Sequence, residues 1–223
     1  MTNMFPQSAI SNIAALILLT AFLLLIVKSP RRLVNIYAWQ SLLLASATLL
    51  EAFITSRQDL YFSALLTLII KVIAISCLLR YLIKKFKISR INQVVVQQNV
   101  LLLIGAAALV LFCYHIITNI ALFSAINAKN ILVVALAVIL FGMLVMLVRR
   151  EALAHVIGFM EIENGLFFAA LIATRGMPMV VELGIAFDVL VAIVLFSVLF
   201  FHIRSNIDSL DIDYLNRLRE DKE

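Results

Sequence analysis

Four polar side chains lie within long apolar stretches of the sequence, where burying them is costly. They are Gln40, Lys71, Glu163 and Asp188. Ionisable residues inside a membrane usually face the interior of a helix bundle and mark paths for protons or ions. Burial disfavours the charged form of carboxyl and amino groups alike, so such groups can exchange protons near neutral pH. The pattern therefore favours a proton path that involves several helices.

The four residues also share a similar depth along the segments that carry them. Glu163 lies about 13 residues after Arg150, which is roughly 20 Å along an α-helix, and Asp188 lies at a comparable depth. Lys71 and Gln40 lie somewhat closer to the basic ends of their segments. A static ion pair between Lys71 and a carboxylate, with hydrogen bonds that hold helices together, would explain the same residues. Both interpretations stay open at this point.

Glu161 is a second carboxyl group close to Glu163. The two are about 200° apart around a helix. Glu161 shares a stripe with Gly158 and Gly165, small residues that let another helix approach closely. We therefore expect Glu161 at a packed interface and Glu163 on the opposite side. Both can face one channel only if the helix contains a π-bulge or a break, and Gly158 or Gly165 could mark such a break.

Three further residues could take up or release ions near the ends of helices. Glu51 and Glu182 lie near the predicted outer ends, and His155 lies near an inner end. A wet position at the membrane surface explains them equally well. The histidines and the two cysteines, Cys77 and Cys113, lack the spacing of a metal site or a disulfide framework. With no nucleophile–base pair or phosphate loop either, we expect no catalytic residue, metal or cofactor in this chain.

The composition shows which solvent these residues meet. Of 223 residues, 64% are hydrophobic and 14% are charged, and the mean hydropathy is +1.10. A soluble domain is about 45–50% apolar and about 25% charged. The excess of apolar residues excludes a soluble enzyme, a nucleic-acid-binding protein and a secreted scaffold. It indicates an all-α, polytopic integral membrane protein.

Apolar runs of about 20 residues, separated by charges, are typical of transmembrane helices. We predict seven, at residues 9–28, 35–54, 60–80, 98–118, 130–148, 154–173 and 180–203. The first follows an uncharged leader without the basic region and cleavage site of a signal peptide, so we expect it to be a true helix. The chain then forms a single membrane domain, 1–223, with short loops.

Lysine and arginine determine the expected orientation, because they concentrate in cytoplasmic loops. With the N-terminus outside, the basic residues fall into three inside loops and the tail. These are Lys28, Arg31, Arg32, Arg80, Lys84, Lys85, Lys87, Arg90, Arg149, Arg150, Arg204, Arg217, Arg219 and Lys222. Only Arg57, Lys129 and Arg175 would lie outside. We therefore predict an outside N-terminus and a cytoplasmic C-terminus.

Two sets of three segments follow the same pattern. In each set, the first segment ends at two arginines, the second has a polar pair near its centre, and the third carries one charge. These residues are Arg31, Arg32, Gln40, Ser41 and Lys71, and then Arg149, Arg150, Glu163, Asn164 and Asp188. We expect a parallel duplication of a three-helix unit, 9–83 and 130–203, with 98–118 as a linker helix. The tail, 205–223, is either a solvated surface helix or a docking strip for a cytoplasmic partner.

Three segments of the second half carry a resemblance to a known family. They are IGFMEIENGLFFAALIA at 157–173, VELGIAFDVLVAIVLF at 181–196 and LDIDYLNRLRED at 210–221. With IYAWQSLLLAS and the Lys71 segment in the first half, they resemble the hydrogenase-4 component E family over nearly the whole chain. Its members are small membrane subunits of formate hydrogenlyase-type and related nickel–iron hydrogenases. The second half is also similar to the K subunit of respiratory complex I and to the C subunit of multi-subunit sodium/proton antiporters.

The resemblance implies roles for particular residues. Glu163 and Asp188 stand where the K-type subunit has its two proton-conducting carboxylates. This sequence departs from the pattern, because Glu161 and Glu163 compete for the first position and Asp188 is shorter than glutamate. In the first half, Gln40 and Lys71 replace the acids, so that copy cannot pass protons in the same way.

The resemblance also implies a non-catalytic subunit of a complex-I-like hydrogenase or formate hydrogenlyase-type complex in the cell inner membrane. Its partners would be antiporter-like membrane subunits and a hydrogenase-type membrane anchor, which hold the redox chemistry. The tail could dock a peripheral subunit. This chain would contribute Glu163, Asp188, Lys71, Glu161 and Gln40 to a central polar axis for the translocation of protons or Na⁺.

Two alternatives to this function stay open. One is a purely structural or assembly subunit of the same complex. The other is a free-standing secondary transporter with a site at the membrane midplane. The transporter is disfavoured because residues 37–47 and 66–76 contain neither glycine nor proline, the residues that break helices around such sites.

Overall fold

The computed structural model describes residues 4–56, 58–85, 96–119, 129–149 and 151–174, together with 190, 191 and 194. Most residues in the long ranges are helical; residues 27–29, Ser56, Arg149 and Glu151 lie between or beside the helices. The elements are α1 (Met4–Ile26), α2 (Pro30–Thr55), α3 (Gln58–Thr67), η1 (Leu68–Ile75), α4 (Ser76–Lys85), α5 (Val96–Asn119), α6 (Lys129–Val148) and α7 (Ala152–Thr174). The described part of the chain is therefore all-α.

Within the described part of the chain, six helices are long and apolar enough to cross a membrane. They coincide with the first six predicted spans, and α3, η1 and α4 together form one of them, Gln58–Lys85. Large apolar side chains such as Trp39, Phe62 and Leu147 lie on the outside of the bundle. Lipid is the solvent that suits such a surface. Apart from residues 190, 191 and 194, the seventh span, 180–203, lies outside the described residues, as does the tail, 205–223. The orientation of the termini stays a prediction.

Local sequence signals determine where α2 begins and ends. Pro30 lies in its first turn, where backbone N–H groups have no partner within the helix. The N–H group that proline lacks is therefore not missed there. At its other end, Ser56 adopts the left-handed conformation, with φ 53° and ψ 31°, which commonly terminates a helix. Because α3 starts at Gln58, α2 and α3 form a tight antiparallel hairpin.

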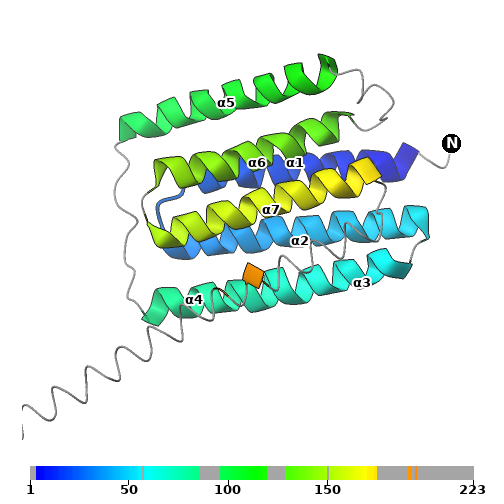
Figure 1. The fold of residues 1–223 in the computed structure, drawn as a ribbon, viewed down its shortest axis with the longest axis horizontal. Helices are drawn as coiled ribbons and strands as arrows, with labels where there is room; N and C mark the ends of the chain where they lie inside the picture. Colours follow the sequence, from blue (N-terminus) through cyan, green and yellow to red (C-terminus); the bar gives the residue numbers. More distant parts are fainter. Residues whose placement is uncertain are drawn as a thin grey trace, which may run out of the picture. The chain divides into compact units, whose positions relative to one another are not determined.

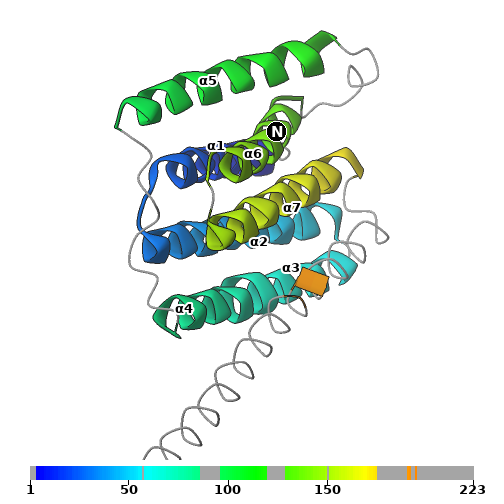
Figure 2. The ribbon, with the colours of Figure 1, turned by 60° about the vertical axis from the view of Figure 1, so that its left-hand side comes forward.

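α2 and α6 are the two helices around which the others pack (Figures 1 and 2). α6 packs against α1, α5 and α7, and α2 packs against α1, α7 and the helix that runs from α3 through η1 to α4. α5 forms one edge of this arrangement, and the α3–η1–α4 helix forms the opposite edge. α7 therefore contacts both α6 and α2. Its side chains lie between the edge formed by α5 and the edge formed by the α3–η1–α4 helix.

Arg149, directly after α6, fastens that helix to the end of α1. Its side chain is 5% exposed, and Nη2 donates hydrogen bonds to the carbonyl oxygens of Leu24, Leu25 and Val27 at 2.9, 2.9 and 2.7 Å. These are carbonyl groups that the end of a helix leaves without partners. Burial lowers the pKa of the Arg149 guanidinium, and the nearby Glu151 carboxylate opposes that shift. Arginine remains charged under all ordinary conditions, so it also neutralises the negative end of the α1 dipole.

The π-helix η1 lies in the middle of the Gln58–Lys85 span and contains Lys71. The hydroxyl group of Ser76 donates a hydrogen bond to the carbonyl oxygen of Lys71 at 3.1 Å, which satisfies a backbone group within the wider turn. Residues 66–76 contain neither glycine nor proline, so this irregular turn forms without either of these residues. The irregular turn coincides with a buried lysine, and π-helical turns occur frequently at functional sites.

Candidate functional site

Two glycines of α7 bring that helix into close contact with α6. A Cβ atom at Gly158 would lie 2.9 Å from the carbonyl oxygen of Gly142, and one at Gly165 would lie 2.9 Å from the backbone nitrogen of Ile139. Only glycine fits such a backbone approach. The predicted break of this helix at Gly158 or Gly165 is wrong, because α7 is continuous from Ala152 to Thr174. The two glycines serve close helix packing instead.

The other sides of α7 carry a buried ion pair. Lys71 Nζ lies 3.0 Å from Glu163 Oε1, and the two side chains are 2% and 6% exposed. Lys71 Nζ also donates a hydrogen bond to Asn164 Oδ1 at 3.0 Å and lies 5.9 Å from the centre of the Phe167 ring. Three side chains of α7 therefore hold the ammonium group of η1.

Two amide side chains extend the contacts of this pair to Glu161. Asn164 Nδ2 donates to Gln40 Oε1 at 3.5 Å, and Gln40 Nε2 donates to Glu161 Oε1 at 3.4 Å. Gln40 belongs to α2, so the contacts alternate between helices. We call the connected side chains the buried polar chain; they are Glu161, Gln40, Asn164, Lys71 and Glu163. Taken as whole residues, backbone included, each of the five is at most 5% exposed.

The hydrogen bonds of the buried polar chain all run in one direction. Lys71 donates to Asn164, Asn164 donates to Gln40, and Gln40 donates to Glu161. Aligned donors polarise one another, and such a series strengthens in a medium of low dielectric constant. The ammonium group thus lies at one end of an aligned series of dipoles, and the Glu161 carboxyl group lies at the other.

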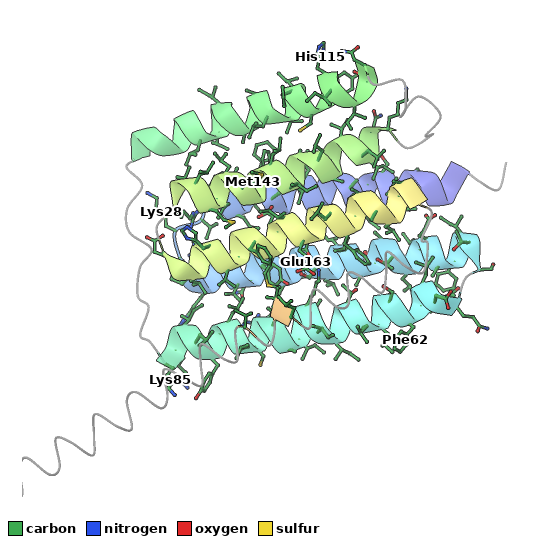
Figure 3. All side chains as sticks on the ribbon, in the orientation of Figure 1. Lys28, Phe62, Lys85, His115, Met143 and Glu163 are labelled. Atoms are coloured by element: carbon green, nitrogen blue, oxygen red, sulfur yellow. The ribbon has the colours of Figure 1, made fainter. Side chains whose placement is uncertain are left out.

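The buried polar chain lies near the middle of the bundle. Glu163 is the central residue of α7, eleven residues from either end, or about 16 Å at the rise of an α-helix. Lys71 is similarly central in the Gln58–Lys85 span. Figure 3 shows Glu163 midway along the bundle, with Lys28 and Lys85 towards one end and His115 towards the other. This depth is about half the thickness of the hydrocarbon core of a membrane.

The two carboxyl groups have different surroundings. Glu163 is paired with a cation, whereas Glu161 is fully buried and accepts a hydrogen bond from the amide group of Gln40. Glu161 Oε2 has no hydrogen-bond partner within the described part of the chain. A carboxyl group in an apolar interior whose hydrogen-bond partner is a neutral amide can bind a proton.

Comparisons with known proteins identify the family. Hydrogenase-4 component E of Escherichia coli is 31% identical over 212 residues, which cover 94% of this chain and 97% of that protein. The protein of the same name in Shigella flexneri matches to the same extent. This chain belongs to the hydrogenase-4 component E family. An uncharacterized protein of Mycobacterium tuberculosis is 27% identical over 190 residues, 85% of this chain and 86% of that protein.

Two other comparisons found nothing. No protein-family model matches this member of the hydrogenase-4 component E family. No solved structure matches it either.

The structure of this family member brings some of the predicted site residues together. Gln40, Lys71, Glu161 and Glu163 form one connected cluster, and α7 needs no break because α2 and η1 approach different sides of it. Glu51 is buried near the end of α2, at 9% exposure. The remaining predicted residues lie apart from the cluster or beyond the residues described here.

His155 lies in the first turn of α7, where its Nδ1 is 3.0 Å from the carbonyl oxygen of Glu151. It therefore lies at an end of the bundle, away from the buried polar chain. Asp188 and Glu182 lie outside the described residues. Their predicted roles stay predictions.

Sequence reasoning missed Asn164 as a functional residue. It lies three residues after Glu161, on the same side of α7, and links the ion pair to Gln40. The spacing of Glu161 and Asn164 was visible in the sequence and could have suggested that both face one neighbouring helix. Arg149 was also missed, since it was counted only as a charge of a cytoplasmic loop.

Proposed function

We propose that this chain is a non-catalytic membrane subunit of a hydrogenase complex, in which its buried polar chain takes part in proton translocation. The observation that carries the proposal is the continuous contact from Glu161 to Glu163 across α2, η1 and α7. Family membership supports the association with a hydrogenase, and the six membrane-span helices support the location in a membrane.

The proposed mechanism uses the charge of Lys71 as the coupling element. When Glu163 gains a proton, Lys71 loses its counterion and is held by Asn164 more strongly. The amide series then stabilises negative charge on Glu161, because its donors point from the ammonium group to that carboxyl group. Protonation at one carboxyl group would thus favour proton release at the other, which are the two halves of a relay.

The location and partners follow from the same proposal. The complex would lie in the cell inner membrane and resemble respiratory complex I, with antiporter-like subunits and a hydrogenase-type anchor beside this chain. Redox chemistry at metals would take place in those partners. Asp188 would extend the polar axis, and either protons or Na⁺ could be the ion moved by the whole complex.

We also propose that the chain contains the parallel duplication expected from its sequence. Helices at corresponding places in the two halves pack side by side: α1 contacts α6, and α2 contacts α7. The buried polar chain lies where the second helices of the two halves meet. Lys71 belongs to the third helix of the first half and reaches across to α7.

A purely structural role is the second candidate. The same Lys71–Glu163 pair, with its hydrogen bond to Asn164, could simply hold three helices together. Breaking a buried pair by removing one partner is strongly destabilising, so a structural role predicts loss of the assembled complex. A coupling role predicts an assembled complex that no longer moves protons.

The deciding experiment uses the whole complex in inverted membrane vesicles. Glu163→Gln, Glu161→Gln and Met160→Leu are compared, because Met160 is a fully buried residue of the same helix that carries no polar group. A tag on the C-terminus reports assembly through the copurifying subunits, and viologen-dependent hydrogen evolution reports the redox partners. We expect both to be unchanged in Glu163→Gln, while hydrogen-linked proton transport is lost. Normal transport in an assembled Glu163→Gln complex would overturn the proposal.

A further inference from the structure

A second set of buried polar side chains leads away from the ion pair along the α3–η1 helix. Ser63, Thr67 and Lys71 are four residues apart and are 0%, 4% and 1% exposed. Their spacing places them on one side of the helix, at intervals of about one turn or 5.4 Å. Lipid-facing residues such as Phe62 and Leu65 alternate with them. The set thus begins near the outer turn of the hairpin and ends at the buried polar chain.

The neighbouring helix α2 supplies polar side chains at matching levels. α2 and α3 run antiparallel from the turn at Ser56, so residues at equal distances from the turn lie side by side. Glu51 is therefore level with Ser63, and Thr48 is close to the level of Thr67. Thr48 is fully buried and Glu51 is 9% exposed. Polar groups thus line both walls of this helix interface.

The hydroxyl groups at this interface are not all satisfied by protein. Thr48 donates to the carbonyl oxygen of Leu44 at 2.9 Å, as buried threonines in helices often do. In contrast, the hydroxyl oxygens of Ser63 and Ser41 are fully buried and have no hydrogen-bond partner within the described part of the chain. Buried polar groups of this kind are usually satisfied by ordered water.

The spacing of the hydroxyl groups suits such water molecules. Two hydrogen bonds of about 2.8 Å that meet at the near-tetrahedral angle of one water molecule span about 4.5 Å, while residues four positions apart on a helix are separated by a rise of about 6 Å. One or two water molecules could therefore connect Ser63 to Thr67 and Thr67 to Lys71. A connected row of hydroxyl groups and water passes protons by exchange, since each member accepts one proton and releases another.

We propose that Glu51, Thr48, Ser63 and Thr67 line a water-filled proton path between α2 and α3 that leads from the Ser56 end of the bundle to Lys71. This α2–α3 path rests on the proposed function, because it supplies the buried polar chain with protons: the Lys71 ammonium group gives a proton to the Glu163 carboxylate, 3.0 Å away, and the neutral amine that results takes up a proton from the path. It ends at an ammonium group, which repels a metal cation in a medium of low dielectric constant. The path therefore suits protons rather than Na⁺.

Cysteine labelling tests whether water reaches these positions. In the assembled complex, Cys77 and Cys113 are first replaced by serine and alanine, which leaves no other cysteine in this chain. Ser63→Cys, Thr67→Cys and Thr48→Cys are then exposed to a small, charged, membrane-impermeant methanethiosulfonate from each side in turn. Phe62→Cys is the matched control, because Phe62 is adjacent to Ser63 but 61% exposed on the outside of the bundle.

We expect Ser63→Cys and Thr67→Cys to react at least about tenfold faster than Phe62→Cys, because the reactive thiolate forms only where water is present. The orientation predicted above places this reaction on the outer side. Thr48→Cys gives an independent reading from the other wall if an α3 variant fails to assemble. Equal, slow labelling at the path positions and at Phe62 would overturn the path.

Transport measurements separate this path from the proposed function. Thr67→Val, which removes the hydroxyl group, should slow hydrogen-linked proton transport severalfold, whereas Thr67→Ser, which keeps it, should not show this loss. Thr20→Val, which alters a part-buried hydroxyl group on α1, should have no effect. If the path positions remain unlabelled but Glu163→Gln abolishes transport, the path is wrong and the proposed function stands. If they are labelled but Glu163→Gln transports normally, the proposed function is wrong and water still enters between α2 and α3.

Discussion

α7 makes two interfaces of opposite kinds with its neighbours. Against α6, Gly158 and Gly165 allow backbone atoms of the two helices to approach so closely that no Cβ fits. Against α2 and η1, the same helix presents Glu161, Glu163 and Asn164, whose contacts are hydrogen bonds and an ion pair. One interface is apolar and close-packed, and the other is polar and connected.

The difference shows how one helix can be held in position on one side and change its charge on the other. Close packing in a protein interior resists displacement, because even small volume changes are felt by the neighbours. A polar interface has alternative states instead, since protons and hydrogen bonds can be redistributed without moving the backbone. α7 is thus anchored on α6 while its polar side can change charge. The following predictions test the two interfaces against each other.

Removing the cation from the polar interface should have the largest effect on stability. Lys71→Met leaves the buried Glu163 without its counterion, and breaking a buried ion pair costs about 3–5 kcal/mol. We expect a clearly lower thermal midpoint in detergent, measured by heating and size-exclusion chromatography. In the double variant Lys71→Met with Glu163→Gln, most of the loss should be recovered. If the single and double variants are equally unstable, the unpaired carboxylate of Glu163 is not the cause of the loss.

Filling the apolar interface should have the next largest effect. In Gly142→Val, the new Cβ would lie 2.6 Å from the carbonyl oxygen of Gly158 and 2.8 Å from the backbone nitrogen of Ile162. Because backbone atoms cannot move aside like a side chain, α6 and α7 must separate, and overpacking of this kind costs about 1–3 kcal/mol. The same heating assay should show this loss.

Gly105→Val is the matched control for that substitution. Gly105 is a glycine of α5 around which a Cβ would meet nothing within 4 Å. Both substitutions add the same side chain to a membrane helix, so intrinsic helix propensity affects them equally. A loss as large in Gly105→Val would show that close contact between α6 and α7 is not the cause.

The two interfaces also differ in how well the sequence predicted them. The six spans within the described residues were predictable, because the thickness of the membrane imposes a length of about 20 apolar residues on each helix. The glycine stripe was predicted to be a packing surface for the same local reason: Gly158 and Gly165 lie on one side of the helix. In this respect Gly158 contacts Gly142 as expected, although the proposed break was wrong.

For the polar interface, the sequence could predict which residues take part but not which of them contact one another. Composition and depth singled out Lys71, Glu161 and Glu163, but their pairing depends on how α2, η1 and α7 approach one another. The π-helical turn at Lys71 had no signal in glycine or proline, because its sequence, LIIKVIAI, is otherwise that of an ordinary apolar helix. Asn164 was overlooked because the sequence does not show which residues an amide beside a glutamate contacts. In the structure its Oδ1 accepts a hydrogen bond from Lys71 of η1, and its Nδ2 donates one to Gln40 of α2.

Removing the connecting amide should have an intermediate effect. Asn164→Leu keeps the volume of the side chain but deprives Lys71 of an acceptor and Gln40 of a donor. A buried polar group left without its partner costs about 1–3 kcal/mol. We expect a modestly lower thermal midpoint and, in the complex, proton transport reduced further than this instability explains. Asn164→Asp tests the direction of the series, because a carboxylate accepts from Lys71 but cannot donate to Gln40. Full transport in Asn164→Asp would show that the donor direction is unimportant.

Replacing Glu161 should have the smallest effect on stability, although this residue is the most completely buried of the three acids and amides on α7. In Glu161→Gln, an oxygen still accepts the hydrogen bond from Gln40, and no ion pair is broken because Glu161 contacts an amide rather than a cation. We therefore expect a change of less than about 1 kcal/mol, within the usual range of mild substitutions. Glu163→Gln, which takes the counterion from Lys71, should lower the thermal midpoint more. If Glu161→Gln proved the more destabilising of the two, the ionised carboxylate on α7 would have to be Glu161, and the roles proposed for the two glutamates would be reversed.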